Sequence, residues 1–273
     1  MKKSILLLFV VLTAILCLAS LITAQDDAGS GQTSLYDVPP RWLVDIPTAG
    51  TLPRGYYSIC VRLYPDGGAL GYTDIGLSHR LMMGISFGGE GVISSRDPDW
   101  NPSIEFGLKF RLIDELEYFP AVSVGFSSQG SGAYNKSLER YTYKSRGFYA
   151  VASRSFYFYQ WTAGWHAGVN YSREYKHDGD KNINFFGGFD ATFKYDLALL
   201  MEYDIAFNDD RSSLPDGSSY EFAGKGRGYL NLSVKWLFAE NLELEAILKD
   251  LLENRREFET LSREIRITYI GRF

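Results

Sequence analysis

The sequence has few cysteines, no excess of basic residues and, after its N-terminal segment, no long apolar run. Its 273 residues include two cysteines, and 28 Lys and Arg stand against 33 Asp and Glu, a formal net charge of −5. A nucleic-acid-binding protein usually presents a basic face, so this charge argues against that class. No apolar run of about 18 residues occurs beyond residue 55, so we expect no transmembrane helix in that part of the chain.

The rest of the composition is that of a folded chain. Hydrophobic residues make up 45% of it, aromatic residues 15% and charged residues 22%. This aromatic content is too high and this charge too low for a disordered protein. The mean hydropathy of −0.15 is typical of a soluble protein, but the average combines both faces of every strand and so does not exclude a membrane barrel.

The first residues have the features of a targeting segment. Two lysines precede an apolar stretch over residues 5–22, and a polar segment follows Ala24. This order predicts a secretory signal peptide over residues 1–24. A retained membrane anchor and a lipoprotein modified at Cys17 are the alternatives. Cleavage after Ala24 would leave Cys60 as the single cysteine, which excludes an intrachain disulfide.

Residues 25–54 have the pattern of neither a strand nor a long helix. Residues 25–34 are polar and rich in Gly and Ser, and the next stretch carries Pro39, Pro40, Pro47 and Pro53. We expect residues 25–54 to be a flexible periplasmic segment or a small plug.

From residue 55 onward, apolar and polar residues alternate with the period of two that is typical of strands with one apolar face. In residues 103–112, for example, Phe106 and Leu108 fall on one face while Glu105 and Lys109 fall on the other. Such runs predict twelve strands, near residues 55–64, 69–78, 81–93, 102–113, 116–128, 145–158, 160–173, 182–195, 197–208, 227–238, 241–250 and 260–273.

The connections and the apolar face favour a closed membrane barrel over a secreted β-sandwich. Very short predicted turns, such as 114–115, alternate with longer polar loops, such as 129–144 and 209–226, as in outer-membrane barrels. Aromatic residues of the apolar face tend to lie near strand ends, where interfacial girdles are expected. In lipid, strands satisfy their backbone polar groups only in a closed barrel. The predicted fold is therefore all-β, an up-and-down transmembrane antiparallel β-barrel of about 12 strands over residues 55–273.

The C-terminus resembles the terminal signature of outer-membrane barrel proteins. That signature is an aromatic last residue preceded by alternating apolar positions, and here it comprises Ile265, Ile267, Tyr269 and Phe273. The resemblance implies that the barrel-assembly machinery recognises this segment.

If the polar phase faces inward, charged side chains line the barrel. The inward bases and acids are nearly equal in number, so many could pair across strands, and no ring of one sign marks an ion-selective pore. Inward glycines such as Gly76, Gly107 and Gly188 would leave space, let residues 35–54 approach, or relieve curvature. The lumen-lining candidates are Glu105, Lys109, Arg111, His166, Asp190, Lys194, Glu202, Asp204, Lys235, Glu245 and Arg266.

Catalytic and metal signals are weak. His166 could meet Asp190 or Glu202 across strands, but a hydrogen-bonded wall residue is the favoured interpretation because no ordered nucleophile and base stand out. No metal spacing, phosphate loop or dinucleotide motif is present, so no cofactor and no enzyme activity are expected. The loop acids Asp209, Asp210 and Asp216 could bind a divalent cation or bridge lipopolysaccharide through it, or could simply be solvated.

Residues 46–55, Ile-Pro-Thr-Ala-Gly-Thr-Leu-Pro-Arg-Gly, followed by alternating strands, resemble the start of YjbH-type proteins. Those are outer-membrane barrels associated with exopolysaccharide production. The resemblance implies a role in polysaccharide passage or surface organisation.

Together these patterns predict a passive channel or export-related barrel for polar solutes, with saccharides as one candidate. The expected location is the outer membrane of a Gram-negative-type bacterium, with both termini periplasmic. The expected partners are membrane lipid, lipopolysaccharide, the assembly machinery and polysaccharide, but not nucleic acid. A structural or surface-interaction barrel with a plugged lumen and an outer-membrane hydrolase are the alternatives.

Overall fold

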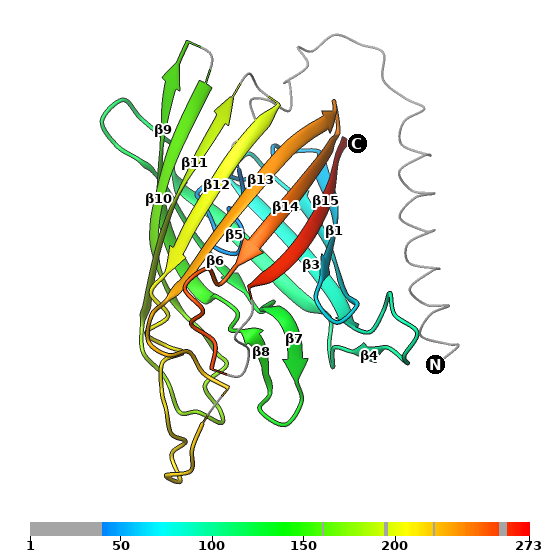
Figure 1. The fold of residues 1–273 in the computed structure, drawn as a ribbon. Helices are drawn as coiled ribbons and strands as arrows, with labels where there is room; N and C mark the ends of the chain where they lie inside the picture. Colours follow the sequence, from blue (N-terminus) through cyan, green and yellow to red (C-terminus); the bar gives the residue numbers. More distant parts are fainter. Residues whose placement is uncertain (1–39, 160, 194–195, 221, 257–260) are drawn as a thin grey trace.

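The computed structural model describes residues 40–159, 161–193, 196–220, 222–256 and 261–273. Twelve strands form a closed antiparallel barrel, in which each pairs with the next barrel strand along the chain and β1 pairs with β15 (Figure 1). This confirms the predicted fold and excludes the sandwich. The barrel strands are β1 (Tyr56–Tyr64), β2 (Gly68–Gly76), β3 (Leu81–Glu90), β5 (Glu105–Ile113), β6 (Ala121–Ser127), β9 (Gly147–Phe158), β10 (Trp161–Tyr171), β11 (Asn184–Phe193), β12 (Leu197–Asp204), β13 (Tyr229–Ala239), β14 (Leu242–Lys249) and β15 (Ser262–Arg272).

Three shorter strands lie outside the closed ring. β4 (Asp99–Trp100) pairs with the end of β3, and β7 (Ser131–Asn135) pairs with β8 (Arg140–Tyr143) in a separate hairpin. The predicted signal peptide lies outside the described residues. In the part of the chain that is described, no helix is long and apolar enough to cross a membrane.

The apolar phase of the strands forms the outer surface. On β5, Phe106 and Leu108 are 62% and 49% exposed, whereas Lys109, on the other face of the strand, is 1% exposed. The same alternation runs along β10, β12, β13 and β15. Burying such a band in lipid removes its apolar area from water, while every strand keeps a neighbour on both sides.

One predicted strand begins later than expected. The fifth run was expected to start at residue 116 after a two-residue turn, but β6 starts at Ala121. The intervening chain forms a longer turn, in which the Leu116 N–H donates to Phe119 O at 2.9 Å. Pro120 follows and has no amide hydrogen for the strand ladder.

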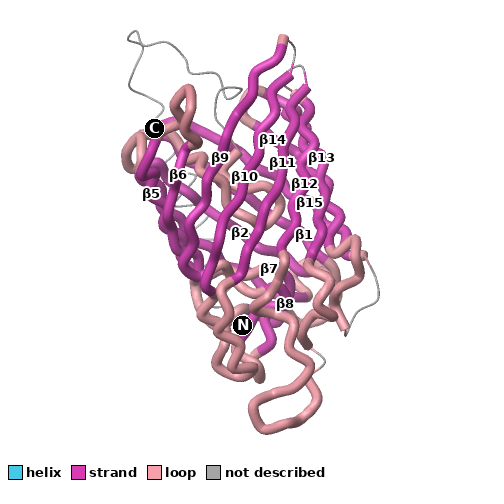
Figure 2. The backbone as a smooth tube through the Cα atoms, turned by 90° about the vertical axis from the view of Figure 1, so that its left-hand side faces the viewer, coloured by secondary structure: helices cyan, strands magenta, loops and turns pink. Residues whose placement is uncertain are grey.

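The two ends of the barrel differ in their connections. The turns from β2 to β3, β5 to β6 and β13 to β14 lie at one end, the short-turn end, where the Phe273 N–H donates to Gly55 O at 2.8 Å. The opposite, long-loop end carries the described connecting residues 91–104, 128–146, 172–183, 205–220, 222–228 and 250–256, which Figure 2 shows gathered together. The turn from β1 to β2 also lies there but is short, and it places Asp66 and Gly67 at positive φ, as tight hairpin turns require.

Residues 40–54 precede β1 and run within the ring of strands (Figure 1). Leu43, Ile46 and Leu52 have no exposed surface, and the backbone of this segment bonds to side chains from strands around the barrel. The interior is therefore occupied by chain as well as by side chains of the wall.

Candidate functional site

Residues 41–48, here called the inner hairpin, fold back on themselves inside the barrel. The Leu43 N–H donates to Ile46 O at 3.0 Å, and the Thr48 N–H donates to Arg41 O at 3.1 Å. These two bonds close the tip and the base of the hairpin. The segment needs no regular secondary structure, because the barrel wall supplies partners for its other backbone groups.

One side of the inner hairpin packs against apolar wall residues. Leu43 and Ile46 share a buried cluster with Tyr149 and Val151 of β9, Phe186 of β11 and Leu200 of β12. A Cβ at Gly188 of β11 would lie 2.3 Å from Leu43 Cδ1. Gly188 thus has no room for a side chain while the inner hairpin is in place.

A buried carboxylate from β12 holds the tip of the hairpin. Glu202 accepts hydrogen bonds from the successive amides of Val44, Asp45 and Ile46, at 2.8 to 3.0 Å. Asn231 Nδ2 donates to the same carboxylate at 2.7 Å. Successive amides that converge on one anion form a concave anion-binding site, so the hairpin tip and Glu202 are complementary in charge and shape.

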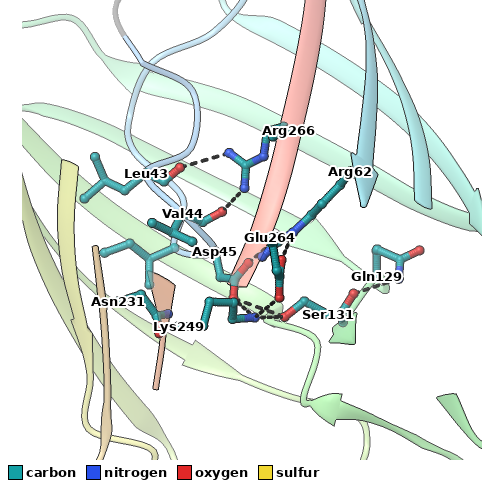
Figure 3. Close-up of polar contacts among 12 residues, drawn as sticks. Leu43, Val44, Asp45, Arg62, Gln129, Ser131, Asn231, Lys249, Glu264 and Arg266 are labelled. Carbon is teal, nitrogen blue, oxygen red and sulfur yellow. Dashed lines mark hydrogen bonds and ion pairs between the residues drawn. The ribbon is translucent and has the colours of Figure 1, made fainter. Parts of the chain in front are cut away.

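Arg266 of β15, three strands along the wall from β12, also binds the hairpin tip. Its guanidinium donates to the carbonyl oxygens of Leu43, at 3.2 Å, and Val44 (Figure 3). The same group contacts Glu245 Oε2 at 3.2 Å, and Ser233 Oγ donates to Glu245 Oε1 at 2.7 Å. Glu202 thus binds backbone amides of the hairpin, and Arg266 binds carbonyl oxygens of the hairpin.

Asp45 joins the hairpin to an ion-pair cluster shown in Figure 3. Its carboxylate lies 2.6 Å from Arg62 Nη1 and 2.5 Å from Lys249 Nζ, and Arg62 also pairs with Glu264. Ser131 Oγ of β7 donates to Asp45 at 3.1 Å. The inner hairpin is therefore connected to the hairpin β7–β8 as well as to the wall.

The chain between the inner hairpin and β1 is held by β5 and β6. Lys109 Nζ donates to Gly50 O at 3.1 Å and to Arg41 O at 2.6 Å. Arg111 Nε donates to Ala49 O at 3.2 Å and its Nη2 to Thr51 Oγ1 at 2.6 Å. Both bases thus bind backbone or hydroxyl oxygens of the enclosed segment.

His166 lies in a hydrogen-bonded chain across β9, β10 and β11. Its Nε2 is 2.7 Å from Asp190 Oδ1, and its Nδ1 is 2.7 Å from Ser153 Oγ. The Ala49 N–H donates to the same Ser153 Oγ at 2.8 Å. Sequence reasoning offered Asp190 or Glu202 as partners of His166; the structure pairs it with Asp190 and adds Ser153. The chain of contacts ends on the enclosed segment, as expected of a wall residue that fixes it.

The other predicted lumen residues have separate surroundings. Asp204 accepts a bond from Asn184 Nδ2 at 2.6 Å, and Lys235 Nζ lies 3.7 Å from Glu243. Glu105 is half-buried near the long-loop end and accepts a bond from Ser103 Oγ at 2.9 Å. Lys194 lies outside the described residues.

The long-loop end carries a buried charged cluster, of which the sequence analysis named only Asp209. Arg140 Nη1 lies 2.6 Å from Asp209 Oδ1, and the Tyr229 hydroxyl donates to Asp209 at 2.8 Å. Burial acts to raise the pKa of Asp209, but the Arg140 guanidinium outweighs it and lowers that pKa. Asp209 therefore serves an internal ion pair, while Asp216 stays exposed.

Glu174 ties the loop 172–183 to the hairpin β7–β8. It accepts hydrogen bonds from the amides of Tyr141 and Ser145, at 3.0 and 3.1 Å. Burial raises the pKa of Glu174 to about 7. Within the described ranges, no group of His, Cys, Asp and Glu is placed to hold a metal ion.

A cavity of about 140 Å³ lies beside the inner hairpin. Its lining reaches from Ile270, on the short-turn side, to Gln129 and Lys144 at the long-loop end. It draws residues from the barrel strands β1, β2, β3, β5, β6, β13, β14 and β15 and from β7 and β8, but none from β9, β10, β11 or β12. The inner hairpin is thus packed against one part of the wall and leaves space at the other.

Sequence reasoning missed the charged residues that lie outside the predicted barrel strands or at their edge. Asp45 falls in the proline-rich segment, and Arg140, Lys144 and Arg146 fall in or beside a region expected to be a polar loop. The one available signal was an acid at position 45 between apolar neighbours, Leu43-Val44 before it and Ile46 after it.

No family model and no curated protein sequence matches the chain. Solved structures with a similar fold include the KdgM porin, at 11% identity, 80% coverage of this chain, 99% of the porin and a TM-score of 0.44. An outer membrane channel from Pseudomonas putida F1 gives 11% identity, 90% and 100% coverage and a TM-score of 0.45. The outer membrane protein Omp33 of Acinetobacter baumannii gives 7% identity, 81% and 99% coverage and a TM-score of 0.43. These are similarities between outer-membrane barrel folds.

Proposed function

We propose that the protein is an outer-membrane channel for small polar solutes, whose passage runs beside the inner hairpin. The observation that carries this proposal is the cavity beside the inner hairpin, whose lining includes charged and hydroxyl-bearing side chains and extends toward both ends of the barrel. A channel needs a continuous polar path that binds solutes weakly enough to release them. The apolar outer band of the closed barrel supports the membrane location.

The lengths of the connections suggest how the barrel is oriented in the membrane. Short turns face the periplasm in outer-membrane barrels, so we place the short-turn end and the C-terminus there. Ile265, Ile267, Tyr269 and Phe273 point outward, with 53%, 39%, 41% and 49% of their surface exposed. That exposure leaves them accessible to the assembly machinery, the partner that their pattern implies.

The solute class is small and polar, and saccharides are candidates. The cavity is lined by hydroxyl and amide groups such as Ser58, Ser86 and Gln129, which can bond to sugar hydroxyls, and by Tyr72. The resemblance of residues 46–55 to YjbH-type proteins points in the same direction, toward polysaccharide passage or surface organisation.

A plugged structural barrel is the second candidate. Its support is the number of wall groups, including Glu202, Arg266 and Lys109, that bind the enclosed segment. An outer-membrane hydrolase has less support, because Ser153, His166 and Asp190 do not line the cavity. A lipid or peptide hydrolysis assay tests it: activity that disappears with His166→Ala would establish the hydrolase.

Single-channel recording in planar bilayers separates the first two candidates. The wild-type chain is compared with a variant in which residues 41–48 are replaced by a Gly/Ser linker of equal length. A channel beside the hairpin predicts a measurable wild-type conductance that rises severalfold in the variant. A wild-type protein without conductance, alongside a conducting variant, would establish the plugged barrel instead.

A further inference from the structure

Two buried guanidinium nitrogens lack hydrogen-bond partners among the described residues. They are Nη2 of Arg62 and Nη1 of Arg41. Arg62 is 3% exposed and uses its other nitrogens for Asp45 and Glu264. Buried donors are normally paired, and leaving one unpaired costs about 1–3 kcal/mol, so each orphaned donor calls for a ligand or water.

Both arginines line the cavity beside the inner hairpin. They come from different elements, Arg62 from β1 and Arg41 from the base of the hairpin. The bonds that hold the base of the hairpin use the backbone of Arg41 and not its guanidinium. The Arg41 carbonyl oxygen accepts from Lys109 and from the Thr48 amide. The charge of Arg41 is therefore not required for the hairpin contacts described above.

Most of the charged residues in the cavity lining already have partners. The bases of the lining are Arg41, Arg62, Lys144, Arg146, Lys235 and Arg266, and its acids are Asp45, Asp74, Glu243 and Glu245. Arg62 faces Asp45 and Glu264, while Lys235 and Arg266 face Glu243 and Glu245. Lys144 and Arg146 pair with acids outside the lining, Asp178 and Asp204. Among the described residues, no acid lies within ion-pair distance of Arg41. Asp74 contacts Ser58 Oγ at 3.4 Å.

We propose that the cavity is a binding site for one oxyanion, a carboxylate or a phosphate, carried by a small polar solute. Arg41 and Arg62 supply the orphaned donors, because guanidinium groups form strong charge-assisted bonds with both anions. Gln129 and Ser86 lie in the same lining and bond to the hydroxyls of the solute. Asp74 disfavours a second negative charge. This inference deepens the proposed channel function and rests on it for the route by which the solute arrives.

The test uses three hexoses that differ in charge: glucuronate, glucose 6-phosphate and glucose. Binding is measured by titration calorimetry on the detergent-folded full chain, and block of single-channel current is measured in bilayers at constant ionic strength. We expect one or both charged hexoses to bind and block at about tenfold lower concentration than glucose, the effect of one charge-assisted hydrogen bond. A response to only one of them identifies the oxyanion.

The variant Arg41→Gln removes one donor group, and Arg54→Gln is the matched control. Arg54 is exposed, in the same segment, and does not line the cavity. We expect Arg41→Gln to abolish the preference for the charged hexoses and Arg54→Gln to retain it. Unchanged heat-modifiable migration in gels confirms that both variants fold.

The outcomes separate this inference from the channel proposal. Calorimetric binding of a charged hexose without any current supports the site and overturns the channel. Current that all three hexoses block equally overturns the site and leaves the channel. Equal binding of all three, or an Arg41→Gln variant that keeps the full preference, also overturns the site, because the orphaned donors then hold water only.

Discussion

The two sides of the lumen differ in what they present to the interior. Strands β9 to β12, the packed half, present the apolar residues Tyr149, Val151, Phe186 and Leu200 and the carboxylate of Glu202 to the inner hairpin. Strands β1 to β3, β5, β6 and β13 to β15, the open half, present small, charged and a few apolar groups to the cavity. The chain thus fixes the hairpin by apolar contact on one side and leaves a cavity with charged residues in its lining on the other.

The largest expected effect comes from removing the anchor of the packed half. Glu202→Ala leaves three hairpin amides without their acceptor, and we expect the free energy of unfolding to fall by about 3 kcal/mol or more. Urea titration in lipid measures this, and single-channel recording should show a larger conductance as the hairpin detaches. Glu243→Ala in the open half is the control, since its partner Lys235 lies 3.7 Å away at a part-exposed site. Equal losses in the two variants would contradict the difference between the halves.

A smaller loss of stability is expected from a substitution at Gly188, where the absence of a side chain leaves room for the hairpin. In Gly188→Ala the new Cβ would meet Leu43 Cδ1 at 2.3 Å and the backbone oxygen of Met201 at 2.6 Å. Overpacking of this kind costs about 1–3 kcal/mol. At Gly107, in the open half, nothing lies within 4 Å of a Cβ, so Gly107→Ala should fold with wild-type stability. Denaturation midpoints in lipid compare the two, and a more damaging Gly107→Ala would reverse the interpretation.

A single hydrogen bond contributes less. Ser153→Ala removes the acceptor of the Ala49 amide and one partner of His166, and we expect a loss of about 1 kcal/mol. Ser86→Ala in the open half, whose hydroxyl bonds only Gln129 among the described residues, should cost less. The unfolding free energies of both variants, measured side by side, are the readout. A greater cost for Ser86→Ala would show that the two halves do not differ in this way.

The smallest expected effect is a dependence on pH at the long-loop end. The pKa of Glu174 is about 7 in the folded chain, above the ordinary value of a glutamate, so its stabilising contribution is present below about pH 4 and is lost as the pH rises through 7. We expect the loop 172–183 to be cleaved faster by protease at pH 8 than at pH 6. Glu174→Gln, which cannot ionise, should remove that difference. If Glu174→Gln keeps the difference in cleavage rate between pH 6 and pH 8, a group other than Glu174 causes that difference.

The barrel could be predicted from the sequence because its signal is local. Alternation such as Phe106, Leu108 and Phe110 against Lys109 is visible over ten residues and decides which face meets lipid. Each of the twelve predicted runs overlaps one barrel strand. The β5–β6 boundary was misplaced because the turn at 114–120 contains the apolar Leu116 and Phe119, which resemble a strand.

The contents of the lumen could not be predicted in the same way. The contact between Ile46 and Glu202 joins residues 156 positions apart, and a segment without periodicity carries no signal for its partner. Pairing within the wall depends on register, which places Gly164 opposite Asp190 and so brings His166 within reach of that acid. The hairpin β7–β8 lies in residues 129–144, whose glycines and polar residues predicted a loop.

Reaction of single cysteines with a small charged thiol reagent during current recording tests the position of the passage most directly. Cys60 of β1 lines the cavity and is the only free cysteine among the described residues. Val151 of β9 lies in the packed half, so Val151→Cys in a Cys60→Ser background places one thiol there. A passage in the open half predicts that the reagent reduces the wild-type current and leaves the Val151→Cys current unchanged. A current reduced through Val151→Cys and unaffected at Cys60 would contradict it.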